Sequence, residues 1–213
     1  MPTEPQTLVL RYTPRTGSRT AGLLDHAVAQ LTGPVVTEDL GQQPPDLFDP
    51  VRIDAYTRRN YAGQPIDAEQ TAALAGMDRL TRQLMDARQV VLAFPVYNFS
   101  VPAAVKAWFD AVIQKQRTWT VRDGQYTGLM AGRRALVIAT AGGPLRGAQA
   151  HHDHALTLAR LQFEFMGFDT VDTVLADAIN ARPEQAPAAL ARARQGIDHV
   201  LRQWNTRDGL GAA

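Results

Sequence analysis

The segment from Gln89 to Asp110 constrains what this chain can fold into more than any other part of the sequence. It begins with the unbroken apolar run Val90–Phe94, which is typical of a parallel strand buried on both faces. Beyond the loop Val96–Phe99, apolar residues recur with a period near 3.6, which predicts a helix with Ser100 as its cap and Pro102 in its first turn. In an open α/β sheet such a loop lies where ligands bind, although an ordinary connection is the alternative.

Four other apolar segments predict strands, and they are Thr7–Tyr12, Val35–Leu40, Ala135–Thr140 and Thr170–Leu175. They alternate with segments of helical periodicity, which predicts a doubly wound sheet of five parallel strands with helices on both faces. A closing helix is expected from about Glu184 to Trp204. The 213 residues, of which 45% are hydrophobic, suit one domain over residues 1–205, followed by a frayed tail over residues 206–213.

Two segments depart from this alternation. Residues 41–65 are polar and contain prolines, but their scattered apolar side chains predict short helices along one edge of a cleft rather than a linker. Asp67 then caps the helix that precedes the central strand. Farther along, the turn signal Asp123-Gly124 lies between Thr118–Val121 and Gln125–Leu129, which predicts a small β-hairpin or an irregular excursion.

The loop after the first strand, Thr13–Thr20, reads TPRTGSRT and places hydroxyl side chains at the start of a helix. Hydroxyls and free N–H groups at a helix N-terminus favour an anion, most often a phosphate, and Arg15 and Arg19 add positive charge. Serine and threonine also serve as plain N-caps in loops that bind nothing, so both interpretations stay open. The loop is neither a Walker A loop nor G-x-G-x-x-G, which disfavours a tightly held nucleoside triphosphate.

The fourth strand ends in Thr140–Gly143, with two glycines at its carboxyl end. Paired glycines there can adopt positive φ and let the backbone approach a planar ligand, or they can form a simple tight turn. The loops after the first, third and fourth strands are expected to meet, because the carboxyl ends of parallel strands share one edge of the sheet.

Composition disfavours several functions. The net charge is +1 without a basic run, so neither a nucleic-acid surface nor an anionic membrane surface is expected. The absence of cysteine excludes disulfides, thiolate nucleophiles and sulfur-ligated metals, and no apolar segment approaches the roughly 20 residues of a membrane span. The first residues lack the features of a secretory signal, so the cytoplasm is the expected compartment. A metal site at His151, His152 and His154 is not predicted. Only His151 and His154 share a face of the expected helix, and no third ligand for that face is suggested nearby in sequence.

The segment PVYNFSVPAAVKAWFD resembles the P-[MV]-Y-N-F-x-x-P-x-x-[LV]-K-x-[WYF]-[FIL]-D segment of the FMN-dependent azoreductases, also called NADH:quinone oxidoreductases. The resemblance implies a flavodoxin-like fold with strand order 2-1-3-4-5 and FMN at the switch between the first and third strands. It also implies a set of flavin contacts, which are Pro95, Val96, Tyr97, Asn98 and Phe99, then Thr140, Ala141, Gly142 and Gly143 matching S-x-G-G. The family's phosphate loop, S-x-P-R-x-x-x-S-x-[ST], maps onto Thr13, Ser18, Arg19 and Thr20.

The resemblance further implies an enzyme that takes a hydride from NADH or NADPH at flavin N5 and passes two electrons to a quinone or an azo compound. No catalytic side chain is predicted, since nothing in the sequence resembles a hydrolytic triad and the flavin carries the chemistry. Two alternatives are a flavodoxin-type electron carrier and a flavin-free binding protein. Members of the family are homodimers with shared active sites, which gives Trp119, Val121 and Phe165 the role of a pocket wall for the partner subunit. Ordinary core packing is the alternative for Phe165.

Overall fold

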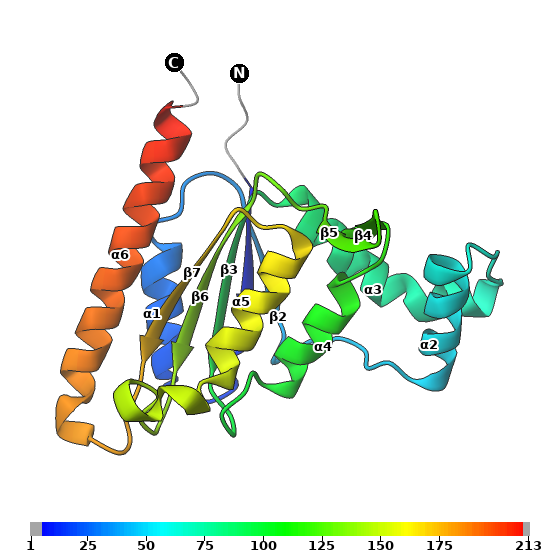
Figure 1. The fold of residues 1–213 in the computed structure, drawn as a ribbon. Helices are drawn as coiled ribbons and strands as arrows, with labels where there is room; N and C mark the ends of the chain where they lie inside the picture. The colour runs from blue at the N-terminus through cyan, green and yellow to red at the C-terminus, as the bar shows by residue number, and fades with distance from the viewer. Residues whose placement is uncertain (1–5, 211–213) are drawn as a thin grey trace.

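The computed structural model describes residues 6–210, and it has a five-stranded parallel sheet at its centre (Figure 1). The strand order is β2-β1-β3-β6-β7, which is 2-1-3-4-5 when the hairpin strands are left out. The predicted fold class is therefore confirmed. The strands of the sheet are β1 (Thr7–Arg11), β2 (Val35–Asp39), β3 (Gln89–Pro95), β6 (Arg134–Thr140) and β7 (Thr170–Ala176).

Helices cover both faces of this sheet. α1 (Arg19–Val28) and α6 (Ala186–Leu210) pack on one face, and α3 (Ala68–Asp86), α4 (Ala103–Val112) and α5 (His154–Met166) pack on the other. The central strand explains why its apolar run is unbroken, because Leu92 and Phe94 point into the core beneath α3 to α5 while Val91 and Ala93 point into the core beneath α1 and α6.

Local sequence signals account for several helix ends. Asp67 and Gln70 form the capping box of α3, with the side chain of each residue accepting from the backbone N–H of the other. Asp153 caps α5, and Gly167 ends that helix in the left-handed conformation with a φ of 92°. Asp67 was predicted to be a cap, and the structure confirms it.

The start of α4 differs from the prediction. The helix begins at Ala103, its N-cap is Pro102, and no side chain caps it, so the assignment of Ser100 as the cap was wrong. Ser100 instead pairs with Tyr97, since each backbone N–H donates to the other residue's carbonyl at 3.0 and 3.1 Å. This pairing closes a tight turn before the helix, and Ser100 therefore belongs to the loop.

The segment between β2 and α3 is helical, as expected. It contains α2 (Pro50–Tyr56) followed directly by one π-helical turn (Thr57–Tyr61), and both lie beside α3 at the edge of the molecule (Figure 1). Two short 3-10 helices, Gly147–His152 and Pro183–Gln185, precede α5 and α6. At the other end, α6 continues to Leu210, past residue 205 where the sequence placed the end of the domain, and residues 211–213 of the expected tail lie outside the described part.

The predicted hairpin is present as β4 (Trp119–Arg122) and β5 (Gln125–Gly128). It follows the C-terminal end of α4 and contacts α5, so it lies toward the amino ends of the sheet strands (Figure 1). A close crossing of two glycines holds it there, because a Cβ on Gly128 would lie 2.3 Å from the backbone nitrogen of Gly167. Within residues 6–210, no helix is long and apolar enough to cross a bilayer.

Candidate functional site

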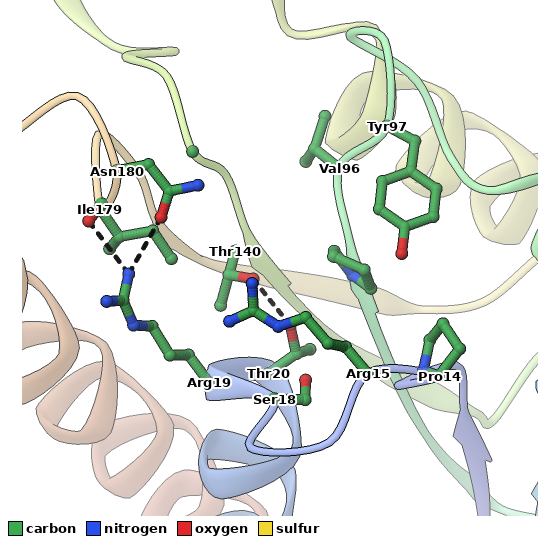
Figure 2. Close-up of a pocket in the computed structure, with 12 residues that line it drawn as sticks. Pro14, Arg15, Ser18, Arg19, Thr20, Val96, Tyr97, Thr140, Ile179 and Asn180 are labelled. Carbon is green, nitrogen blue, oxygen red and sulfur yellow. Dashed lines mark hydrogen bonds between the residues drawn. The ribbon is translucent and has the colours of Figure 1, made fainter.

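A cavity of about 170 Å³ opens at the carboxyl ends of β1, β3, β6 and β7 (Figure 2). It includes eight of the predicted cofactor contacts, and they are Ser18, Arg19, Thr20, Pro95, Val96, Tyr97, Thr140 and Gly142. Four further lining residues are Pro14, Arg15, Ile179 and Asn180. The three loops that the sequence expected to meet therefore do meet.

The first wall of the cavity is the N-terminus of α1. Ser18 is the N-cap, and its Oγ accepts a hydrogen bond from the N–H of Ala21 at 3.2 Å. The next hydroxyl, that of Thr20, is buried and lies 2.7 Å from the hydroxyl of Thr140, which ties the first loop to the loop after β6. Ser18 thus serves as a cap and lines the cavity at once, so the two interpretations of this loop are compatible.

Two arginines give this wall a positive charge. The side chain of Arg15 is exposed at the rim of the cavity. The side chain of Arg19 crosses to the loop after β7, where its Nη1 donates to the carbonyl of Ile179 at 3.0 Å and to Oδ1 of Asn180 at 3.2 Å (Figure 2). Hydroxyls, a helix N-terminus and guanidinium groups together fit an anion such as a phosphate.

The second wall is the loop after β3, which is a strained turn. Asn98 and Phe99 both have positive φ, 48° and 67°, between the paired residues Tyr97 and Ser100. Two consecutive left-handed residues are typical of a type I′ turn, in which glycine is strongly preferred at the second position. A phenylalanine there is unfavourable, and such strain concentrates at functional sites.

The two aromatic side chains of this turn have different surroundings. Tyr97 lines the cavity and meets the ring of Tyr12 edge-on at 6.1 Å. Burial and the neighbouring Tyr97 raise the pKa of Tyr12, so its phenol stays protonated over the working range of pH. Phe99 is 53% exposed outside the cavity, with its ring 5.2 Å from that of His152.

The sequence allows two interpretations of the glycine loop after β6. Neither Gly142 nor Gly143 has a positive φ, so neither uses the left-handed conformation that glycine permits. Gly142 is nevertheless crowded, because a Cβ there would lie 2.9 Å from Nδ2 of Asn180. The space that Gly142 leaves is therefore used by a protein side chain.

The loop after β7 organises this region, and the sequence did not single it out. Its N–H groups at Asn180 and Ala181 both donate to the carbonyl of Gly142, at 3.0 and 2.9 Å, and Ala178 donates to Gly143 at 2.9 Å. Ala178 has a φ of 58°, which is unfavourable for a residue with a Cβ. Topology could have predicted its role, because the loop after the fifth parallel strand begins at the same edge of the sheet as the loops after the first, third and fourth strands.

Several predicted contacts do not line the cavity, and they are Thr13, Asn98, Phe99, Ala141 and Gly143. Thr13 faces a different partner, since its hydroxyl accepts from Nε of Arg11 at 2.8 Å. The predicted wall residues Trp119, Val121 and Phe165 also lie away from this chain's own cavity, toward the opposite end of the sheet.

Two of these wall residues, Trp119 and Phe165, belong to an aromatic cluster formed by the hairpin and α5. The rings of Trp119 and Phe165 lie 5.3 Å apart, and Tyr126 lies 5.4 Å from the first and 5.6 Å from the second. Tyr126 is 74% exposed and stands directly opposite Val121 in the β4–β5 pair, so both side chains project from the same face of the hairpin. Phe163 is fully buried and packs in the core, whereas Phe165 is only partly buried and lies in the surface cluster.

The histidines lie at the end of the 3-10 helix and the start of α5. The rings of His151 and His152 are tilted by 47° with their centroids 3.9 Å apart, and Asp153 separates them from His154. Across residues 6–210, no group of three or more histidine, aspartate or glutamate side chains is placed to hold a metal ion.

Comparison with known proteins identifies the family. A profile described as flavodoxin-like fold matches residues 5–201. An FMN-dependent NADH:quinone oxidoreductase of Shewanella loihica is 31% identical over 187 residues, which cover 86% of this chain and 92% of that protein. One from Hyphomonas neptunium is 32% identical over 209 residues, covering 93% and 97%. The chain belongs to this family of oxidoreductases. The resemblance seen in the Tyr97 loop is thus confirmed.

Solved structures agree on the fold of the family. An azoreductase from Bacillus anthracis superposes with a TM-score of 0.86 at 20% identity, covering 93% of this chain and 99% of that one. An FMN-dependent NADH-azoreductase of the same species, solved in complex with FMN, gives a TM-score of 0.81 at 18% identity, covering 92% and 99%.

Proposed function

We propose that this protein is an FMN-dependent NAD(P)H oxidoreductase that reduces quinones and azo compounds. The observation that carries the proposal is a single cavity with an anion-binding wall at the N-terminus of α1 and an aromatic wall at Tyr97, in a chain of the FMN-dependent NADH:quinone oxidoreductase family. FMN has the same two parts, a phosphate and a flat aromatic ring. The donor set of the cavity therefore fits the cofactor.

The residues divide by the part of the cofactor they suit. Ser18, Arg19 and Thr20 bind the phosphate, because they present hydroxyl, guanidinium and backbone donors at one point. The loop of Val96, Tyr97, Asn98 and Phe99 and the segment from Thr140 to Gly143 would hold the flavin ring. When bound, FMN supplies the redox chemistry, accepting a hydride from the nicotinamide and passing two electrons on.

The protein's own contribution is orientation. The hydrogen bond between Thr20 and Thr140 fixes the phosphate wall relative to the glycine loop, and both are immobilised in the buried part of the site. The reciprocal bonds between Tyr97 and Ser100 fix the ring wall. Rigid walls of this kind would hold a bound cofactor in one orientation.

An electron carrier is the less suitable alternative. The relatives that match over nearly the whole chain carry names of substrate-reducing enzymes. In addition, α2, the π-helical turn and the β4–β5 hairpin add surface around the fold that a carrier does not require. Purified protein loaded with FMN should oxidise NADH or NADPH in the presence of a quinone, and a preparation that binds FMN but turns over no acceptor would favour the carrier.

We also propose that the active enzyme is a homodimer in which the aromatic cluster of one subunit closes the pocket of the other. The support is geometric, since Trp119, Tyr126 and Phe165 form an ordered and partly exposed group far from their own cavity. Tyr126 projects beside Val121 from the same face of the hairpin, so its ring can add to this wall an aromatic surface that Val121 does not provide.

A mixed dimer tests this arrangement. One subunit carries Ser18→Glu, which places a carboxylate where the phosphate should bind, and the other carries Phe165→Ala. Each homodimer should be inactive. In the heterodimer, the Phe165→Ala subunit keeps its own FMN site and receives an unaltered wall from its partner, so activity should return. A purified heterodimer as inactive as its parents would show that Phe165 acts within its own chain.

A further inference from the structure

The contact between Arg19 and Asn180 is not explained by the sequence motif of the phosphate loop. We propose that Asn180 is a positioning residue that holds the Arg19 guanidinium at the phosphate end of the cavity, and that this makes the site select FMN over its dephosphorylated form, riboflavin. This inference rests on the proposed function, which assigns the cavity to FMN. Asn180 comes from the loop after β7, the one wall of the cavity for which the sequence offered no motif.

The geometry leaves part of the guanidinium for a ligand. Arg19 is the first residue of α1, and its two hydrogen bonds to the loop after β7 both use Nη1. A guanidinium carries five N–H donors, two of them on Nη1. The N–H groups on Nε and Nη2 are therefore not used by these two bonds. They lie in one plane, so they can donate to two oxygens of a phosphate.

Asn180 itself lies against Gly142 through both its backbone and its side chain. Its backbone N–H donates to the carbonyl of Gly142 at 3.0 Å, and its side-chain amide occupies the space beside Gly142 that a Cβ would fill. The amide orientation follows from its partner, because an arginine can only donate and so requires the oxygen of Asn180 to face it. The loop therefore presents a fixed acceptor to a flexible cation.

Fixing the cation before the ligand arrives should raise affinity for the phosphate. A long side chain that is already ordered loses less rotamer freedom on binding than a free one. Arg15 is the contrasting case, since it lines the same cavity but its guanidinium has no hydrogen-bond partner among the described residues. The structure thus contains one ordered and one unrestrained cation at the same site.

A double-mutant cycle measured with two flavins tests the proposal. Apoprotein of the wild type, Asn180→Ala, Arg19→Ala and the double variant is titrated with FMN and with riboflavin, following flavin fluorescence. Asn180→Ala should weaken FMN about fivefold and riboflavin less than about twofold, because only FMN presents a phosphate to Arg19. In the Arg19→Ala background, Asn180→Ala should add no further loss.

Competition by inorganic phosphate gives a readout that needs no flavin ring contact. The dissociation constant of phosphate is obtained from its displacement of FMN, corrected for the FMN affinity of each variant. This constant should be higher for Asn180→Ala than for Arg15→Ala. Asn205→Ala is the matched control, because Asn205 is an exposed asparagine on α6, away from the cavity. Circular dichroism and thermal melting confirm folding, and Asn180→Ser provides a second shortened side chain in case the alanine variant does not fold.

The outcomes separate the inference from the function beneath it. Equal weakening of FMN and riboflavin would overturn the positioning role, and so would losses from Asn180→Ala and Arg19→Ala that simply add. An Asn180→Ala variant that binds FMN like the wild type would also overturn it, with the FMN assignment intact. A wild type that binds neither flavin would contradict the FMN assignment itself, and the inference would fall with it.

Discussion

Replacing Phe99 tests whether the turn at the proposed flavin ring wall is strained for function. The φ of 67° at this residue costs about 1–2 kcal/mol for any residue with a Cβ, and glycine is free of that cost. Glycine also loses more conformational freedom on folding, by about 0.5–1 kcal/mol. Phe99→Gly should therefore be more stable than Phe99→Ala by about 0.5–1 kcal/mol, although glycine is the less stable of the two residues at ordinary positions.

The comparison of these two variants isolates the backbone, because both lose the same ring and its contact with His152. For a chain of this size, the difference corresponds to a melting temperature about 1–4 °C higher for Phe99→Gly, measured by calorimetry on the apoprotein. Leu161 provides the control, since it is exposed in the interior of α5, where Leu161→Ala should be more stable than Leu161→Gly.

FMN binding supplies the functional half of the test. If the strain is retained because the Phe99 ring contributes to the flavin site, both Phe99 variants should bind FMN more weakly than the wild type, whichever of them melts higher. If Phe99→Gly melts below Phe99→Ala, the backbone at residue 99 is not strained and the reasoning from φ is refuted. Unchanged FMN affinity in both variants would show that the ring has no role in the site.

Three further substitutions probe the loop after β7, the edge of the sheet and the aromatic cluster. Ala178→Gly should raise the free energy of unfolding by about 0.5–1 kcal/mol, because it relieves a φ of 58°, and a lower melting temperature would contradict this. Hydrogen bonds from Arg79 hold the pKa of Glu38 in the folded protein below its ordinary value. The pair therefore stabilises the fold fully at any pH above the pKa that Glu38 has in the unfolded chain. This stabilisation is lost as the pH falls through the lower pKa that Glu38 has in the folded protein. Between about pH 6 and about pH 3 the wild type should therefore lose more stability than Glu38→Gln in urea denaturation, and parallel losses would argue against the pair. Tyr126→Ala should change the free energy of unfolding by under about 1 kcal/mol, because the side chain is 74% exposed. The same variant should have a lower kcat/KM for a quinone. Unaltered kinetics would show that Tyr126 is not part of the site.

The sequence predicted the sheet well because its signals are local and redundant. In β3 every side chain from Val90 to Phe94 is buried, so the apolar run itself specified a strand covered on both faces. Asp67 and the Asp123-Gly124 turn likewise act through neighbours a few residues away. Where the loops meet also followed from topology, since parallel strands of one sheet end at one edge.

The errors fall where tertiary contacts decide the conformation. Ser100 has the chemistry of a cap, but its backbone is used to close the turn with Tyr97. Nothing in the sequence indicated that the space beside Gly142 holds the side chain of Asn180, 38 residues farther along the chain. Phe99 carries no sequence signal for a left-handed turn, because glycine is the residue that such turns favour.

The most direct test of the proposed function separates the two half-reactions in an anaerobic stopped-flow instrument. Protein loaded with FMN is mixed first with NADH or NADPH alone, and the reduced protein is then mixed with a quinone, while the absorbance of the oxidised flavin is followed. We expect the flavin to be bleached by at least one nicotinamide in the absence of quinone, and its absorbance to return when quinone is added, both at rates that support steady-state turnover. Flavin that stays oxidised with both nicotinamides, or reduced flavin that a quinone does not reoxidise, would contradict the assignment of this chain as an NAD(P)H:quinone oxidoreductase.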